Sequence, residues 1–231
     1  MNHDETFIVA SSKAWHAQDF DQFREGMPGV WLYVDNSRKL LELVQSVSPA
    51  FIFFLHWNWR VPSEVIEQNV CVCFHMTDVP YGRGGSPLQN LIIRGHKCTK
   101  LTALRMVQEM DAGPVYCKRE LSLEGKASEI YLRAGKISWE IIKWIVETRP
   151  VPESQVGEVV IFKRRTPEQS QIPLNGPLRQ FYDYIRMLDA PTYPKAFIEY
   201  GEYTIEFSDA VIDDDNELRA NVRITLKGNE S

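Results

Sequence analysis

The stretch from Cys71 to Pro87, CVCFHMTDVPYGRGGSP, constrains the fold most, because an apolar run ends on a histidine and passes directly into a glycine-rich turn. In a β-strand, successive side chains point to opposite faces, so Cys71, Cys73 and His75 share one face. We therefore expect His75 to be an exposed side chain at the end of a strand.

The residues after this histidine predict a loop followed by a helix. Glycines at positions 82, 84 and 85 allow the backbone to approach a ligand closely. Ser86 followed by Pro87 has the form of a helix N-cap and first helical position. A strand, a histidine, a glycine loop and a helix start together predict a ligand site at the carboxyl end of a strand in a parallel sheet.

Short apolar runs alternate with helical patterns along the first 150 residues. The runs that we interpret as strands are Thr6–Ala10, Trp31–Val34, Ala50–Leu55, Cys71–His75, Thr99–Val107 and Val115–Leu121. Alternation of this kind predicts an α/β fold with a Rossmann-like, mostly parallel sheet. The first strand is not followed by Gly-x-Gly-x-x-Gly or Gly-Lys-Ser/Thr, so a nicotinamide or triphosphate site lacks its usual support.

The chain is expected to divide near Pro150. A long amphipathic helix starting at Ser128 closes the first domain, residues 1–150. Residues 151–231 carry a linker, a helix and two strand-like segments, Phe197–Phe207 and Glu217–Leu226, which predict a small C-terminal α+β subdomain.

Composition indicates an ordinary protein of the cytoplasm. The chain has 231 residues, of which 44% are hydrophobic, and a net charge of −5. Without a basic cluster beyond Arg164-Arg165 or an apolar run long enough to span a bilayer, we expect neither nucleic acid nor a membrane as a partner. The N-terminus is acidic, unlike a signal peptide, and four cysteines in a chain of this size indicate reduced thiols.

Taken alone, each candidate residue also has a plain structural interpretation. A histidine after a strand is usually hydrogen-bonded, and an aspartate before Ala-Gly-Pro, as at Asp111, is usually a turn former. Cys71, Cys73 and His75 could also be three metal ligands on one strand face, although no fourth ligand follows at finger-like spacing.

Two motifs in series carry a more specific signal. The segment HMTDVPYGRGGSPLQNLIIRG, followed by TALRMVQEMDAGPV, resembles the 10-formyltetrahydrofolate-dependent formyltransferases. Their pattern is Asn-x-His-x-Ser-x-x-Pro-x-x-x-Gly, a helix, and a strand ending in Asp-x-Gly-Pro. The resemblance covers most of residues 50–150 and, more weakly, the C-terminal part, and it implies the formyltransferase fold with 10-formyltetrahydrofolate as co-substrate.

The resemblance also implies roles for particular residues. His75 would be the acid/base or cationic stabiliser, and Asp111 would orient and charge-stabilise that imidazole. The loop after the third strand would give backbone hydrogen bonds to the pterin, and the loop before Asp111 would add further contacts. The pterin candidates are Trp59, Arg60, Val61, Val107, Gln108, Glu109 and Met110, and the candidates for the acceptor side are Tyr81, Arg83 and Gly84.

One position departs from the family pattern. Cys73 stands where the family has an asparagine that donates to the carbonyl oxygen, and a thiol is a weak donor. Loss of one such donor typically costs about 10²–10³ in turnover. A backbone amide, a water or Asn58 could take over, or Cys73 could act as a nucleophile beside His75. Thr77 in place of the family serine keeps a hydroxyl.

We therefore predict a sugar N-formyltransferase of the pseudaminic-acid-pathway type. The length and the small acidic appendage favour an enzyme of the cytoplasm that formylates the primary amine of a nucleotide-linked 4-amino sugar. The resemblance adds a homodimer as an expectation. Two alternatives stay open: a catalytically impaired folate- or nucleotide-binding protein of this fold, and a metal-binding module built on Cys71, Cys73 and His75.

Overall fold

The computed structural model describes residues 5–213 and 216–227, and it divides into two compact units. The first unit consists of the chain up to Gly84 together with residues 100–121 and 134–161. The second consists of residues 85–99, residues 122–133 and the chain from Phe162 onward. The expected division into residues 1–150 and 151–231 stays a prediction.

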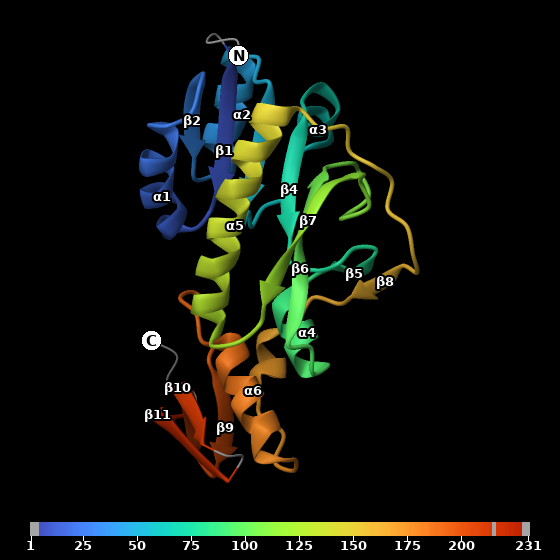
Figure 1. Cartoon of the computed structure of the whole chain (residues 1–231). Coiled ribbons are helices and arrows are strands. Elements are labelled where there is room, and N and C mark those ends of the chain that lie inside the picture. Colours follow the sequence, from blue (N-terminus) through green and yellow to red (C-terminus); the bar gives the residue numbers. More distant parts are fainter. Residues whose placement is uncertain (1–4, 214–215, 228–231) are drawn as a thin grey trace. The chain divides into compact units, whose positions relative to one another are not determined.

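The first unit is built on a mixed sheet. Among the described residues, six strands lie in the order β2-β1-β3-β4-β6-β7 (Figure 1). Their bounds are Thr6–Ser11 (β1), Val30–Val34 (β2), Phe51–Leu55 (β3), Cys71–His75 (β4), Cys98–Arg105 (β6) and Val115–Ser122 (β7). Strands β2, β1, β3 and β4 pair in parallel, and β6 is antiparallel to β4. The predicted α/β class with a mostly parallel sheet is confirmed.

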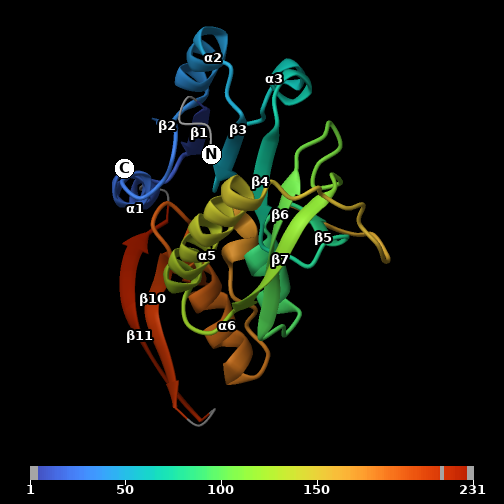
Figure 2. The same cartoon turned by 45° about the horizontal axis from the view of Figure 1, so that its top comes forward.

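Helices cover both faces of this sheet. They are α1 (Ala14–Arg24), α2 (Ser37–Ser46), α3 (Ser63–Gln68) and α5 (Ala127–Thr148). Leu40 of α2 and Val65 of α3 share a buried cluster with Ile8 and Phe54 of the sheet, on the side away from α5 (Figure 2). The opposite face carries aromatic residues that include Trp139 of α5. Because both faces are covered, the parallel strands are continuous apolar runs rather than alternating ones.

Two helix starts test the sequence rules. Asn36 caps α2, because its side chain accepts a hydrogen bond from the backbone N of Lys39 at 3.0 Å. Helix α4 (Pro87–Ile93) begins at Pro87, but the side chain of Ser86 makes no capping hydrogen bond. Ser86 has a left-handed backbone with φ of 50°, and its hydroxyl accepts from the backbone N of Arg165 at 3.0 Å instead. Ser86 therefore occupies the predicted N-cap position, but its side chain does not cap the helix.

The glycine-rich turn is more regular than expected. Tyr81–Gly84 forms a short strand, β5, that pairs with β8 (Val160–Phe162). The glycines at positions 82 and 84 have φ of 80° and 103°, a conformation that L side chains rarely adopt. These glycines therefore shape a strand edge rather than an open loop.

The second unit contains a small antiparallel sheet. Within the described residues its order is β11-β10-β9, formed by Glu217–Leu226 (β11), Tyr203–Asp213 (β10) and Ala196–Tyr200 (β9). Helix α6 (Leu178–Leu188) packs on it through Phe181 and Phe207, whose ring centroids lie 5.3 Å apart. The short 3₁₀ helix η1 (Pro167–Ser170) precedes α6. Phe197–Phe207 is two strands rather than one, because Gly201 turns the chain with φ of 57°.

Two histidines of the first unit form a pair: His16, which is buried in α1, and the part-buried His56, which follows β3. Nε2 of His16 lies 2.9 Å from Nδ1 of His56, and Nδ1 of His16 has no hydrogen-bond partner among the described residues. Burial, and then the neighbouring His56, lower the pKa of His16 from 6.5 to about 3. Burial and the charge of Lys13 lower the pKa of His56 from 6.5 to about 4. Both rings are therefore neutral at pH 7.

This pair predicts a loss of stability in mild acid. The pKa of each histidine is 6.5 in the unfolded chain and about 3 or 4 in the folded one. Below about pH 6.5 the unfolded chain therefore binds more protons than the folded one, and the free energy of unfolding falls as the pH drops. We expect a loss of roughly 2–5 kcal/mol between pH 7 and pH 4.5, at about 1.4 kcal/mol for each pKa unit. Urea unfolding at several pH values measures it. A His16→Asn, His56→Asn double variant should have a flatter pH dependence, and an unchanged slope would contradict the assignment.

Candidate active site

His75 lies at the end of β4, with its ring between two oxygen acceptors. Its Nε2 donates to the carbonyl oxygen of Gly82 at 2.8 Å, and its Nδ1 lies 3.6 Å from Oδ2 of Asp111. The residue is 8% exposed, so the expectation of an exposed histidine is wrong. The chain after β4 folds back as β5 and places Gly82 against the ring. An imidazole between two acceptors can donate from both nitrogens only when it is protonated.

The Asp111 carboxylate is placed by backbone geometry as well as by hydrogen bonds. Asp111 has a left-handed backbone with φ of 55°, which costs a non-glycine residue about 1–3 kcal/mol unless its surroundings favour it. The backbone N of Gly84 donates to Asp111 Oδ2 at 2.9 Å, and this oxygen is also the one that faces His75. The structure thus brings together the two side chains that the sequence placed in separate motifs.

Gly113 allows the Asp111 loop to lie against β6. A Cβ atom at position 113 would lie 1.7 Å from the carbonyl oxygen of Arg105, far inside van der Waals contact. The backbone N of Arg105 donates to the carbonyl oxygen of Pro114 at 2.8 Å. The Gly-Pro pair after Asp111 is therefore needed for a close backbone approach and is more than a generic turn.

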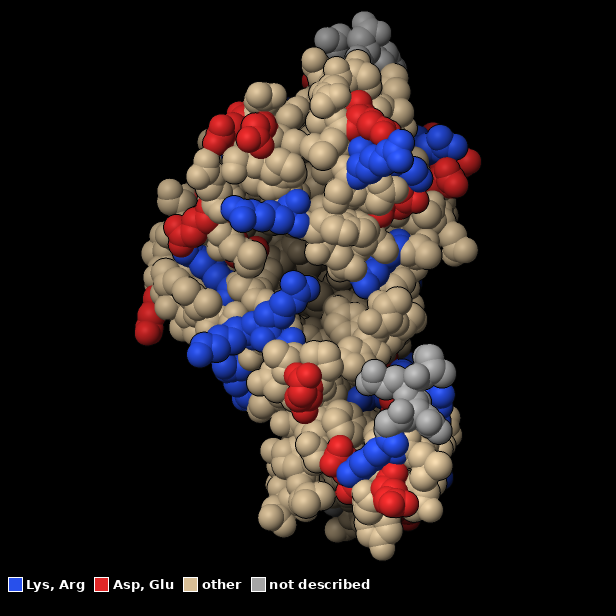
Figure 3. Space-filling view, turned by 180° about the vertical axis from the view of Figure 1, so that it is seen from behind, with Lys and Arg blue, Asp and Glu red and all other residues tan. Residues whose placement is uncertain are grey.

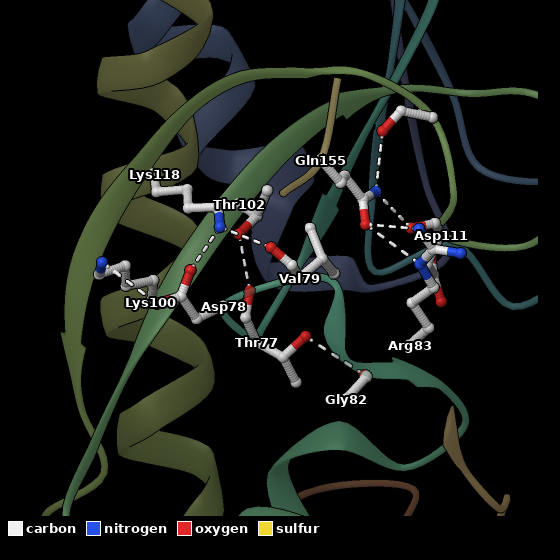
Figure 4. A network of polar contacts seen from close by, with 11 residues as sticks. Thr77, Asp78, Val79, Gly82, Arg83, Lys100, Thr102, Asp111, Lys118 and Gln155 are labelled. Carbon is white, nitrogen blue, oxygen red and sulfur yellow. Dashed lines mark hydrogen bonds and ion pairs between the residues drawn. The ribbon is translucent and has the colours of Figure 1, made fainter. Parts of the chain in front are cut away.

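Hydrogen bonds also fix the turn between β4 and β5. Thr77 donates to the Gly82 carbonyl at 3.2 Å, and Thr102 of β6 donates to the Thr77 carbonyl at 2.6 Å (Figure 4). The hydroxyl at position 77 thus shares an acceptor with His75. In this structure it supports the position of the histidine.

An ion-pair group lies at the same turn and was not predicted from the sequence. Lys118 of β7 donates to Oδ1 of Asp78 and to the carbonyl oxygen of Val79, both at 2.5 Å, and Lys100 lies 3.1 Å from Oδ2 of Asp78. Burial alone would raise the pKa of Asp78, but the hydrogen bonds from Lys118 and Lys100 outweigh it and leave that pKa below its usual value. In the sequence, the one indication of a role for Asp78 is its position three residues after His75.

The structure argues against a nucleophilic role for Cys73. Burial, the charge of Asp111 and the neighbouring Cys71 raise the pKa of the Cys73 thiol well above its usual value. Since the thiolate is the nucleophile, a thiol that stays protonated reacts poorly. Asn58, the side chain considered as a substitute donor, is exposed.

The metal-binding alternative also loses its basis. Across residues 5–213 and 216–227, no group of three or more His, Cys, Asp or Glu side chains is arranged to hold a metal ion. Cys71 is buried and its thiol faces the carbonyl oxygen of Val65 at 3.7 Å.

The predicted pterin residues after β3 differ in exposure. Trp59 is 44% exposed, and its ring lies edge-on to Trp57 with a centroid distance of 4.9 Å. Arg60 is exposed, whereas Val61 is buried in the cluster beneath α2 and α3. Any contact from Val61 to a ligand would therefore come from its backbone, as the resemblance implies.

The predicted pterin residues before Asp111 lie on an exposed segment. Val107 is 39% exposed and Met110 is 71% exposed. Gln108 donates to Glu67 at 2.5 Å, and Glu109 lies 3.2 Å from Arg83. Large apolar side chains left in water beside a buried His–Asp pair suit a ligand contact, and the pterin assignments stay predictions.

Two of the predicted acceptor-side residues are engaged within the chain. Arg83 donates to Gln155 Oε1 through Nε and Nη2, at 3.1 and 2.9 Å, and Gly84 gives its N–H to Asp111. Tyr81 is half-buried. Gln155 was missed by sequence reasoning, since it lies in a polar stretch without a motif.

A cavity of about 380 Å³ lies in the first unit, between β7 and the segment that contains Gln155. Its lining residues are Val115, Tyr116, Cys117, Lys118, Val151, Glu153, Ser154, Gln155 and Val156. None of the predicted pterin residues lines it, so this cavity does not test their assignment.

The comparison with known proteins decides the family. The chain is 43% identical to a solved methionyl-tRNA formyltransferase from Clostridium thermocellum, with a TM-score of 0.93 over 96% of this chain and 99% of that one. The chain belongs to the formyltransferase family. Residues 167–225 match the family model for the C-terminal domain of methionyl-tRNA formyltransferase.

More distant relatives agree with this family. A methionyl-tRNA formyltransferase from Thermodesulfovibrio yellowstonii is 25% identical over 162 residues, which are 67% of this chain and 51% of that protein. The present chain thus spans about half the length of this curated relative. HypX from Aquifex aeolicus, in complex with tetrahydrofolic acid, shares the fold at 16% identity and a TM-score of 0.71, over 90% of this chain and 38% of that one. The expected co-substrate, 10-formyltetrahydrofolate, is confirmed at the level of the family.

The comparisons also correct two expectations. The predicted sugar branch and nucleotide-sugar substrate are wrong, because the relatives that establish the family are named for methionyl-tRNA. For the same reason, the expectation that no nucleic acid is a partner is wrong. No helix in the described part of the chain is long and apolar enough to cross a bilayer. The cytoplasmic location and the homodimer stay predictions.

The close packing at Gly113 gives a test of the site geometry. Gly113→Ala should shift the Asp111 loop and lower the free energy of unfolding by about 2 kcal/mol or more, because the new methyl group meets backbone that cannot yield. Gly26→Ala is the matched control, since nothing lies within 4 Å of its added Cβ. Urea unfolding of both variants measures the difference, and equal stability would contradict the packing described.

Proposed function

We propose that this formyltransferase transfers the formyl group of 10-formyltetrahydrofolate to the amino group of methionyl-tRNA. The observation that carries the proposal is the His75–Asp111 pair, whose side chains are 10% and 13% exposed and 3.6 Å apart, in a chain 43% identical over nearly its whole length to a solved methionyl-tRNA formyltransferase. Neither feature is sufficient alone, because a His–Asp pair occurs in many proteins and a shared fold does not fix the substrate.

The proposed chemistry is direct transfer. The amine nitrogen attacks the formyl carbon, the carbonyl oxygen becomes an oxyanion in a tetrahedral intermediate, and the bond from the formyl carbon to the folate nitrogen then breaks. The amine loses one proton and the folate nitrogen gains one, so one acid/base group serves both steps. His75 is assigned that role, with Asp111 holding its charged form. At 3.6 Å the two groups interact through their charges, and a proton passes between them only through a bridging water or after the distance shortens.

A transfer-RNA acceptor needs cations on the protein, and the second unit offers a group of them. Arg94, the C-cap residue of α4, donates to the backbone and side-chain oxygens of Asn90, and Asn90 in turn donates to the carbonyl oxygen of Lys163 at 3.0 Å. Lys163, Arg164 and Arg94 are exposed. In Figure 3, several Lys and Arg side chains lie close together on one part of the visible face, whereas elsewhere on this face Lys and Arg are interspersed with Asp and Glu.

Local cations can act despite a net charge of −5. At physiological salt the Debye length is about 8 Å, so a phosphate at the surface responds mainly to nearby side chains. The expectation that no nucleic acid is a partner relied on the net charge and on the lack of a basic cluster along the sequence. Net charge governs the long-range attraction of a charged ligand more than the contacts it makes once bound. Arg164 and Arg165 form a larger basic group with Lys163 and Arg94 only once the chain is folded.

The function is tested by incubating the protein with 10-formyltetrahydrofolate and methionyl-tRNA and looking for N-formylmethionine by mass spectrometry. Asp111→Asn should lower kcat about 10²–10⁴-fold, the range of general acid–base contributions, because a neutral amide cannot stabilise the imidazolium. Asp21→Asn, on an exposed helix surface, should be fully active. Absence of product with the unaltered protein would refute the acceptor, and full activity of Asp111→Asn would refute its role.

The protonated state of Cys73 predicts that no thioester forms. Cys73→Ser should keep activity within about tenfold of the unaltered protein, since direct transfer needs no thiolate. Intact-mass measurement after incubation with the formyl donor alone should show no formyl group on the chain. A formyl adduct that disappears in Cys73→Ser but persists in Cys98→Ser would support the covalent route instead.

A further inference from the structure

Gln155 lies outside every motif, yet its segment is fixed to the edge of the sheet. The backbone N of Val115 donates to the carbonyl oxygen of Glu153 at 2.7 Å, and the N of Glu153 donates back to the Val115 carbonyl at 2.9 Å. This pair of bonds attaches residues 151–156 to β7. The half-buried side chain of Gln155 is thereby held beside the Asp111 loop.

Both ends of the Gln155 amide are fully used. Its Nε2 donates to the carbonyl oxygens of Asp111 at 2.7 Å and Gly113 at 2.8 Å. Its Oε1 accepts from Nε and Nη2 of Arg83. A primary amide has two donor hydrogens and two acceptor lone pairs, so all four are satisfied. The opposite amide orientation would place donors against the guanidinium and an oxygen against two carbonyls, which fixes the assignment.

The amide therefore joins two segments that are distant in sequence. One is the loop of Asp111 and Gly113, and the other is β5, which carries Arg83 and Gly84 (Figure 4). The N–H of Gly84 holds the Asp111 carboxylate, while Gln155 holds the backbone of the same residue. These bonds close a ring in which the carboxylate and its backbone are positioned from opposite sides.

The left-handed backbone of Asp111 needs the additional hydrogen bonds that Gln155 supplies. A non-glycine residue with φ of 55° persists only where its surroundings over-determine it. The Gly84 N–H holds the carboxylate, and within the loop the N–H of Ala112 donates to the carbonyl oxygen of Glu109 at 3.3 Å. Gln155 adds the bonds to the carbonyl oxygens of Asp111 and Gly113, which fix the peptides on both sides of residue 112.

We propose that Gln155 is a positioning residue for Asp111, and that Arg83 acts in the same unit by orienting the Gln155 amide. This inference rests on the proposed function of the His75–Asp111 pair. It gives Arg83 a role within the chain, through the acceptor of Gln155 and the carboxylate of Glu109 at 3.2 Å. Gln155 itself touches no reacting atom in this assignment.

The decisive comparison is between Gln155→Leu and Gln155→Glu. Leucine removes both donors and the acceptor, whereas glutamate keeps the acceptors for Arg83 and places a carboxylate against the carbonyls of Asp111 and Gly113. Both variants should lower kcat about 10²-fold, as expected for a catalytic group misplaced by about 1 Å, with KM changed less than threefold. Gln18→Ala, on the exposed side of α1, is the matched control and should behave as the unaltered protein.

Hydrogen exchange separates this inference from the proposed function. Amides of residues 109–114 should exchange at least tenfold faster in Gln155→Leu, with β1 and β3 unchanged, whether or not formyl transfer is detected. An unaltered protein without activity would overturn the function alone. Normal exchange of this loop, or a full kcat in Gln155→Leu, would overturn the positioning role.

Discussion

The carboxylate of Asp111 is the constraint on which the rest of the site depends. A buried charge is costly unless hydrogen bonds or an opposite charge compensate it. Here Oδ2 accepts the N–H of Gly84 at 2.9 Å and lies 3.6 Å from Nδ1 of His75, so one oxygen is held by a backbone donor and faces an ionisable ring. The strained backbone at Asp111 and the Cβ-intolerant position of Gly113 follow from bringing that oxygen to the end of β4. A different loop conformation would leave the His75 ring without a facing carboxylate.

The β4–β5 turn matters for the same reason. Gly82 gives its carbonyl oxygen to both His75 and Thr77, which fixes the imidazole edge that does not face Asp111. Asp78 and Lys118 hold the next residues of the turn against β7. The glycines thus place backbone donors and acceptors around the two catalytic candidates. The N–H of Gly84 and the carbonyl of Gly82 are both used within the chain.

Local sequence rules were sufficient where contacts are local. The strands of the first unit, the start of α2 at Asn36 and the start of α4 at Pro87 follow from apolar runs and capping residues, and two motifs identified His75 and Asp111 correctly as neighbours. The failures involve partners distant in sequence. Ser86 bonds to Arg165 rather than to its own helix, and Gln155 reaches the Asp111 loop from more than 40 residues away. Burial of His75 depends likewise on the return of β5, which no periodicity in the chain predicts.

The acceptor was the least accessible feature, and the reason is physical. The fold and the His–Asp geometry serve formyl transfer to any amine, so specificity must lie in surfaces that recognise the rest of the acceptor. Net charge describes such surfaces poorly, because contact with a phosphate depends on side chains within about 8 Å. Asn90 connects Arg94 to the Lys163 backbone and so gathers cations that are some 70 residues apart. A sequence that is acidic overall can therefore present a local basic surface, and this makes a net charge of −5 compatible with the proposed transfer-RNA acceptor.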